Sequence, residues 1–172
     1  TLPVRKRRKS SYLTVTGKFC SLKNEHLVAH EGHRERDFFV LLEYDPTVVR
    51  YRAHPFALSL KSSGRRRRYT PDVLVEYAQQ QDGAVPWPEV CEVKLQRLYE
   101  KDRAALDLKF AEATQVLQAR KQKFRLVTEL VLRQPLLSNL YFLLSYRRCS
   151  PDTVLGQAIL SALGGGRVLT AN

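Results

Sequence analysis

The chain of 172 residues contains YTPDVLVEY at residues 69–77 and PEVCEVKL at residues 88–95, two segments rich in apolar and β-branched side chains. Their pattern of alternating residues predicts a strand for each. Because a polar loop with Asp82-Gly83 lies between them, we expect the two strands to pair as a hairpin. In that hairpin Asp72 of the first strand and Glu92 of the second are expected to face each other.

Two carboxylates held this close repel one another unless a cation lies between them, and a hard divalent ion such as Mg²⁺ suits oxygen ligands. Lys94 lies two residues after Glu92 and therefore on the same face of the strand. There its ammonium group can orient a water molecule and neutralise charge that develops on a phosphate. This pattern indicates metal-dependent hydrolysis of phosphodiesters. A surface hairpin with an ion pair is the alternative that these residues leave open.

The formal net charge of +12 is concentrated in two blocks. Residues 1–20 carry six positive charges and no acid, and Arg65–Arg68 add four more; the remaining Lys and Arg nearly balance the 17 Asp and Glu. Such blocks are typical of proteins that bind nucleic acid, although a solvated tail and a basic loop would give the same count. The predicted DNA-binding residues are Arg5, Lys6, Arg7, Arg8, Lys9, Arg65, Arg66, Arg67 and Arg68.

The remaining elements complete an α/β pattern. Helical spacing predicts helices at 31–44, 98–122 (one long amphipathic helix), 134–146 and 152–163. Strands are expected at 13–16, 48–52, 56–60 and 124–128, with a turn at 61–64. This order predicts a mixed β-sheet flanked by helices.

Several features limit the class of protein. No apolar run approaches the ~18 residues of a membrane helix. Three widely spaced cysteines form neither a disulfide framework nor a metal motif, which indicates a reducing, intracellular setting; Cys91 is expected to be a small core residue. Trp87 is expected to pack over the hairpin rather than to stack on a base. Glu35, in the first turn of the helix at 31–44, is either a third site acid or a carboxylate that stabilises the helix N-terminus.

A longer series of motifs resembles a known family. The chain reads ERDFF at 35–39, LLEYDP at 41–46, YTPD at 69–72 and EVK at 92–94, in this order. Over residues ~12–148 this order resembles TnsA, the endonuclease subunit of heteromeric cut-and-paste transposases, which is related to the type II restriction fold and its PD-(D/E)XK motif. The resemblance implies a restriction-endonuclease-like mixed sheet with a helical or winged-helix-like C-terminal unit, of which only the start is present.

The resemblance also implies an active site. Glu35, Asp72 and Glu92 would bind Mg²⁺, with Mn²⁺ as an alternative, and the Val93 carbonyl would be an additional ligand. Lys94 would position the attacking water. Two histidines depart from the family pattern: His33 stands where many relatives have Ser, and His54 precedes Pro55 where Gln-Pro is usual. Neither histidine is expected to touch the acidic residues.

The implied function is cleavage of one DNA strand at each transposon end, while a partner DDE transposase cuts the other strand. The expected domains are a basic arm at 1–11, the nuclease domain at 12–148 and, at 149–172, the beginning of a C-terminal domain that engages a regulatory ATPase. Double-stranded DNA is the expected substrate, in a bacterial cytoplasm and without a membrane. Two alternatives stay open: a stand-alone restriction- or resolvase-like nuclease, and a non-catalytic DNA-binding or scaffold module.

Overall fold

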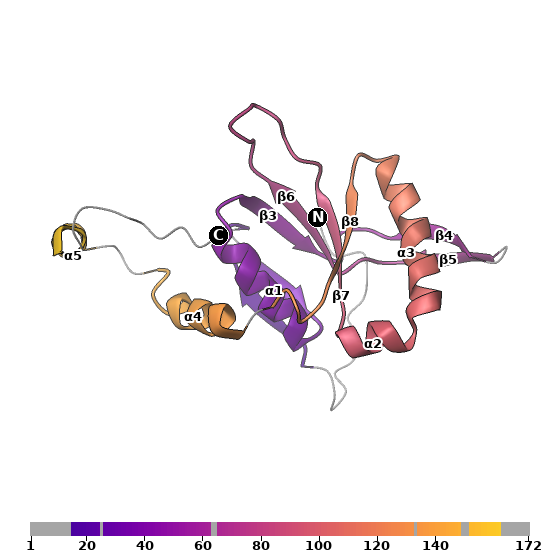
Figure 1. Ribbon diagram of the computed structural model, residues 1–172, viewed down its shortest axis with the longest axis horizontal. Helices are drawn as coiled ribbons and strands as arrows, with labels where there is room; N and C mark the ends of the chain where they lie inside the picture. The colour runs from indigo at the N-terminus through magenta and orange to yellow at the C-terminus, as the bar shows by residue number, and fades with distance from the viewer. Residues whose placement is uncertain (1–14, 25, 63–64, 133, 149–151, 163–172) are drawn as a thin grey trace. The chain divides into compact units, whose positions relative to one another are not determined.

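The computed structural model describes residues 15–162 except 25, 63–64, 133 and 149–151, and it divides the chain into two compact units, 1–140 and 141–172. Along the described chain the elements are β1 (Gly17–Cys20), β2 (Leu27–His30), α1 (His33–Tyr44), β3 (Val48–Ala53), β4 (Leu58–Ser62), β5 (Arg65–Tyr69), β6 (Val73–Tyr77), β7 (Glu89–Val93), α2 (Gln96–Lys101), α3 (Arg103–Gln118), β8 (Lys123–Val127), α4 (Gln134–Leu144) and α5 (Thr153–Ala162) (Figure 1). None of the helices in this described part is long and apolar enough to cross a membrane.

The central sheet has the strand order β3-β6-β7-β8. β3 and β7 both run antiparallel to β6, which confirms the predicted hairpin, and β8 runs parallel to β7. A parallel pair needs a crossover connection, and α2 and α3 supply it. The other four described strands form two separate two-stranded sheets, β1-β2 and β4-β5. The predicted α/β fold with a mixed sheet and flanking helices is confirmed.

Helix α1 buries an apolar face against β3. The ring of Phe39 lies 5.3 Å from that of Tyr51, and both side chains are fully buried. Tyr51 is the register partner of Val75 on β6, so α1 packs close to the middle strands. The helix ends at Tyr44, and Asp45 is extended, as expected from Pro46, because the residue before a proline avoids the helical region.

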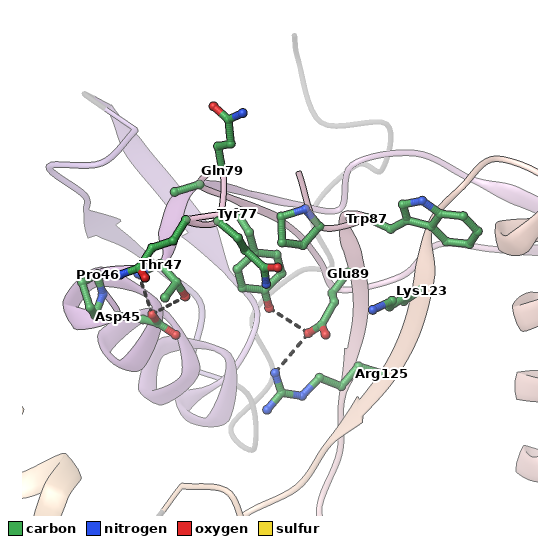
Figure 2. Close-up of a pocket in the computed structure, with 13 residues that line it drawn as sticks. Asp45, Pro46, Thr47, Tyr77, Gln79, Trp87, Glu89, Lys123 and Arg125 are labelled. Carbon is green, nitrogen blue, oxygen red and sulfur yellow. Dashed lines mark hydrogen bonds and ion pairs between the residues drawn. The ribbon is translucent and has the colours of Figure 1, made fainter. Parts of the chain in front are cut away.

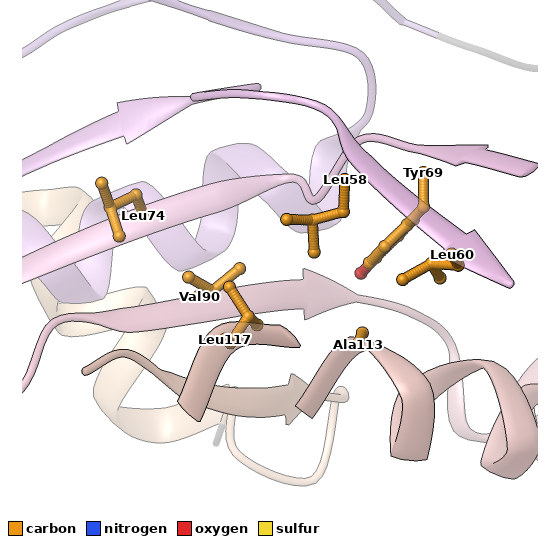
Figure 3. Close-up of a cluster of buried hydrophobic side chains, with 7 residues drawn as sticks. All are labelled: Leu58, Leu60, Tyr69, Leu74, Val90, Ala113 and Leu117. Atoms are coloured by element: carbon orange, nitrogen blue, oxygen red, sulfur yellow. The ribbon is translucent and has the colours of Figure 1, made fainter. Parts of the chain in front are cut away.

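Helix α3 packs against β4 and β8. Here one core cluster joins the β4-β5 ribbon, the sheet and the helix, and Figure 3 shows its members pointing toward one another: Leu58, Leu60, Tyr69, Leu74, Val90, Ala113 and Leu117. Cys91 is fully buried, as predicted, and burial raises the pKa of its thiol to about 12. The ribbon that carries the arginines of β5 therefore shares a hydrophobic core with the sheet.

The predicted single strand at 69–77 is wrong. The chain forms β5 up to Tyr69 and β6 from Val73, and Asp72 lies in a bend between them. Pro71 has no backbone N–H to give to a ladder, which favours a break here. As a result β5 pairs with β4, while β6 pairs with β3 and β7.

Three other predicted boundaries need correction. The helix expected at 98–122 is two helices, because Asp102 has φ −113° and ψ 23°, outside the helical region, and Asp is a poor residue for a helix interior. The strand expected to end at Thr16 instead begins at Gly17, and residues 13–14 lie outside the described part. Lys61 belongs to β4 rather than to a turn.

Candidate active site

Asp72 is fixed by backbone hydrogen bonds against the end of β7. Its N–H donates to the carbonyl of Cys91 over 3.1 Å. Its Oδ2 accepts from the N–H of Val93 over 2.8 Å. Asp72 and the last residues of β7 are therefore neighbours, as the sequence predicted from the hairpin, although Asp72 lies in a bend and not in a strand.

The electrostatic environment of Asp72 disfavours its charged form. Burial raises the pKa of this carboxyl well above its usual value, and the nearby charges of Glu92 and Glu35 raise it further. The Val93 N–H and Lys94 oppose this shift but do not cancel it. Three acids gathered in a partly buried place are more stable together with a cation or a proton between them.

Glu92 is held from both sides. Only 7% of this residue is exposed, and its Oε2 accepts a hydrogen bond of 2.8 Å from the hydroxyl of Tyr69. Burial and the charge of Glu92 raise the pKa of that hydroxyl, which keeps it protonated and therefore a donor. The other oxygen, Oε1, lies 3.7 Å from the Nζ of Lys94 and 3.6 Å from the Nζ of Lys109.

Lys109 is a site residue that the sequence prediction missed. It comes from α3, and its Nζ also lies 3.9 Å from the centre of the Tyr69 ring, in a cation–π contact. Its one sequence signal is weak: Lys109 follows Leu106 by three residues and precedes Phe110, so it borders the apolar stripe of the helix. Its proximity to Glu92 depends on how α3 packs on the sheet, which the sequence pattern does not specify.

A second missed residue is His54. Glu35, His54 and Asp72 each offer one ligand atom, and these atoms all lie within 4.8 Å of one another. The expectation that His54 stays away from the acids is therefore wrong. β3 and β6 are antiparallel with Ala53 opposite Val73, so the next residue lies beside Asp72, and the N–H of His54 donates to the Asp72 carbonyl over 2.7 Å. Pairing the two predicted strands in this register would have revealed it.

These residues fit a divalent metal ion. Carboxylate oxygens and an imidazole nitrogen are donors that divalent metals accept. Burial and the neighbouring carboxylates Glu92 and Glu35 raise the pKa of Asp72, and a bound cation would offset both effects. Glu35 lies in the first turn of α1 and accepts a hydrogen bond of 2.8 Å from the N–H of Glu31, which fixes one of its oxygens. The donors thus come from three separate elements and are positioned by backbone contacts.

The predicted DNA-binding residues are described only in part. Arg66, Arg67 and Arg68 are exposed on β5. The β4-β5 register places Arg66 opposite Lys61 and Arg68 opposite Ser59, so these four residues share one face of the ribbon. Arg66 to Arg68 also line a surface pocket of about 400 Å³. The arm residues Arg5, Lys6, Arg7, Arg8 and Lys9, and the Arg65 side chain, lie outside the described residues.

Another pocket, of about 730 Å³, is lined by Tyr77, Glu89 and Arg125 among others (Figure 2). Glu89 begins β7, whereas Glu92 lies near the end of that strand, beside Asp72. In this pocket Glu89 Oε2 accepts from the hydroxyl of Tyr77 over 2.8 Å and from Nη1 of Arg125 over 3.1 Å. Trp87 also lines this pocket and is 43% exposed; its packing over the hairpin stays a prediction.

A mixed sheet flanked by helices, with carboxylates and a lysine where β6 and β7 meet, is the fold of restriction-endonuclease-like nucleases. Residues 45–129 match the family described as "TnsA-like endonuclease N terminal", which supports a TnsA-like nuclease domain in this part of the chain. The matched segment includes His54, Asp72, Glu92, Lys94 and Lys109, and it begins after Glu35. The comparison with curated proteins gave no match.

Proposed function

We propose that this chain is a divalent-metal-dependent DNA endonuclease that cuts one strand at each transposon end, together with a DDE transposase that cuts the other. One observation carries the proposal: the half-buried Asp72 carboxyl, whose pKa is raised by desolvation and by Glu92 and Glu35, is hydrogen-bonded to the Val93 N–H and lies near the lysine of the EVK motif. A protein that only holds DNA gains nothing from acids gathered within its positive field, because they repel phosphate.

In this proposal Glu35, Asp72 and Glu92 hold Mg²⁺ or, as an alternative, Mn²⁺, with the Val93 carbonyl as an additional ligand. The bound ion supplies a Lewis acid and lowers the pKa of a bound water. Lys94, whose ammonium lies 3.7 Å from Glu92, would orient the attacking water and neutralise charge that develops on the phosphate. Tyr69 and Lys109 position Glu92 through the contacts described above.

The basic residues deliver the DNA to this site. The face of the β4-β5 ribbon that carries Lys61, Arg66 and Arg68 is exposed and positive, and β5 leads through Tyr69 directly to Asp72. A phosphate backbone bound by these side chains would be positioned but not read by sequence. The arm at 1–11 adds further phosphate contacts in the proposal.

The partners and compartment belong to the same proposal. The DDE transposase is the partner in cleavage, and a regulatory ATPase would be engaged through a C-terminal domain that begins at 149. The protein would act in the bacterial cytoplasm on double-stranded DNA, with the domain boundaries at 11 and 148 predicted from the sequence.

The test is a strand-specific cleavage assay on transposon-end DNA with Mg²⁺ or Mn²⁺, with and without the transposase. We expect Asp72→Ala to abolish nicking while circular dichroism and DNA affinity stay close to those of the wild type. Full nicking by this variant would contradict the site. Cleavage of plain duplex DNA by the isolated chain would instead favour a stand-alone nuclease, and failure of the wild type to cleave under every condition would favour a scaffold.

A further inference from the structure

His54 occupies a position that only the folded chain brings to the acids. It directly follows β3, and its N–H donates to the Asp72 carbonyl over 2.7 Å. The residue is 95% buried, since 5% of its surface is exposed. Its ligand atom, that of Glu35 and that of Asp72 lie within 4.8 Å of one another. A buried imidazole among carboxylates is therefore part of the same cluster.

The backbone of His54 indicates that this position is constrained. Its φ of 45° lies in the left-handed region, which non-glycine residues rarely adopt. Histidine is among the few residues enriched there. The hydrogen bond from its N–H to the Asp72 carbonyl fixes the backbone of His54 beside Asp72 before any ligand binds.

Glu92, in contrast, is already engaged by cations of the protein. Its Oε1 lies 3.7 Å from the Nζ of Lys94 and 3.6 Å from that of Lys109, and its Oε2 accepts from Tyr69. The group formed by Glu35, His54 and Asp72 has a nitrogen donor in addition to its oxygens. Asp72 belongs to this group and also interacts electrostatically with Glu92, so it links the two.

We infer that His54 is a metal ligand, together with Glu35 and Asp72, and that the site prefers a transition-metal dication such as Mn²⁺ over Mg²⁺. This inference rests on the proposed nuclease function, because it concerns the metal of that site. Mg²⁺ strongly prefers oxygen ligands, whereas imidazole is a good ligand for the first-row transition metals. One nitrogen in place of an oxygen thus changes which ion binds more tightly, without changing the class of reaction.

The direct test uses the wild-type chain with Mn²⁺ and pulsed electron paramagnetic resonance. A directly bound imidazole gives a ¹⁴N coupling to the Mn²⁺ electron spin. We expect this coupling in the wild type and in His26→Gln, whose exposed histidine lies in the β1-β2 loop, and its loss in His54→Gln. Mn²⁺ that binds to the wild type without a ¹⁴N coupling would overturn the inference, whatever the variants do.

Affinity gives a second readout. By calorimetry, His54→Gln should weaken Mn²⁺ binding about 10- to 100-fold, the range seen when groups around a metal are altered, and should weaken Mg²⁺ binding by a smaller factor. His54→Asn provides a second variant, because Asn also tolerates a positive φ. An equal loss for both ions in folded variants would contradict a specific role for the imidazole.

The cleavage assay separates this inference from the proposed function. If the wild type cleaves transposon ends but Mn²⁺ shows no nitrogen coupling, the nuclease proposal stands and the role of His54 is wrong. If Mn²⁺ shows the nitrogen coupling but no condition gives cleavage, the metal site stands and the nuclease proposal is wrong.

Discussion

Strand β7 carries two glutamates, Glu89 at its beginning and Glu92 near its end, and each lies in a similar local unit. Glu89 accepts a 2.8 Å hydrogen bond from Tyr77, and Glu92 accepts one of the same length from Tyr69. Each is also paired with a basic side chain, Arg125 in the first case and the two lysines of the site in the second. A tyrosine, a glutamate and a cation are thus a recurring way to hold a carboxylate on this sheet.

The two ends differ in what surrounds that unit. At the Glu89 end, burial alone would lower the pKa of Arg125, but its hydrogen bond and ion pair with Glu89 outweigh this and raise it. At that end, one carboxylate, Glu89, is therefore balanced by one guanidinium, Arg125. At the Glu92 end, Asp72 and Glu35 add negative charge, and the pKa of Asp72 rises because of burial and these neighbours. Excess carboxylate, not the glutamate unit itself, distinguishes the candidate active site from a structural network.

The largest expected effect is on the cleavage rate, when Lys94 at the Glu92 end is compared with Arg125 at the Glu89 end. Lys94→Ala should lower the cleavage rate by at least about 100-fold, the scale of removing one group that stabilises charge in a transition state. Arg125→Ala removes the equivalent cation at the other end and should leave the rate per folded molecule within a few-fold. The measurement is single-turnover nicking of transposon-end DNA. Equal losses in the two variants would remove the distinction between the ends.

Lys109 should have the next largest effect. Because its ammonium holds Glu92 and contacts the Tyr69 ring, Lys109→Ala should reduce cleavage or metal affinity about 10- to 100-fold, with partial rescue by Lys109→Arg. Lys123→Ala at the Glu89 end is the matched control. If calorimetry and nicking both give wild-type values for Lys109→Ala, the lysine has no positioning role.

The stability of the metal-free protein should change in opposite directions at the two ends. Because the pKa of Asp72 is raised in the folded state, its protonated form favours folding at low pH, and this contribution is lost as the pH rises through the folded-state pKa. At neutral pH, Asp72→Asn should therefore raise the melting temperature, and the gain should shrink in acid. Glu89→Gln should lower the melting temperature, because it deprives Arg125 and Tyr77 of their partner.

Thermal unfolding of both variants with a metal chelator, at several pH values, provides the measurement. A lower melting temperature for Asp72→Asn at neutral pH would show that the acids at this end are already balanced by the protein.

The smallest effect is expected from the two hydroxyls. Tyr69→Phe and Tyr77→Phe each remove one hydrogen bond to a carboxylate, which should cost about 1–3 kcal/mol of stability. The two variants should differ in activity: Tyr69→Phe should lower the cleavage rate severalfold, while Tyr77→Phe leaves it unchanged. Denaturant unfolding and nicking, measured on the same samples, separate the two effects; a Tyr77→Phe protein that cuts as poorly as Tyr69→Phe would contradict the comparison.

Much of the fold could be predicted from local patterns. Helix α1, the β6-β7 hairpin and β8 follow from hydrophobic periodicity and from Pro46 and Gly83, and Gly83 has the positive φ of 83° that its turn requires. The breaks at Pro71 and Asp102 were missed because the apolar pattern continues across them. There the backbone rules for single residues outweigh the periodicity.

The residues of the candidate site also fall into two groups, those that local sequence patterns predict and those that depend on tertiary structure. Asp72 and the EVK motif could be placed together because one hairpin connects them. His54 and Lys109 could not, since each reaches the site through tertiary structure: His54 through the register of β3 on β6, and Lys109 through the packing of α3 beside Tyr69. A motif in the sequence specifies residue types, whereas these two positions depend on strand register and helix rotation.

Calorimetric titration of Mn²⁺ and Mg²⁺ into the wild type, Asp72→Ala and Glu89→Gln tests the central claim most directly. Our account predicts that the wild type and Glu89→Gln bind the ions with similar affinity and that binding to Asp72→Ala is lost. Metal binding that survives in Asp72→Ala but disappears in Glu89→Gln would contradict it, because the metal site would then lie at the other end of the sheet.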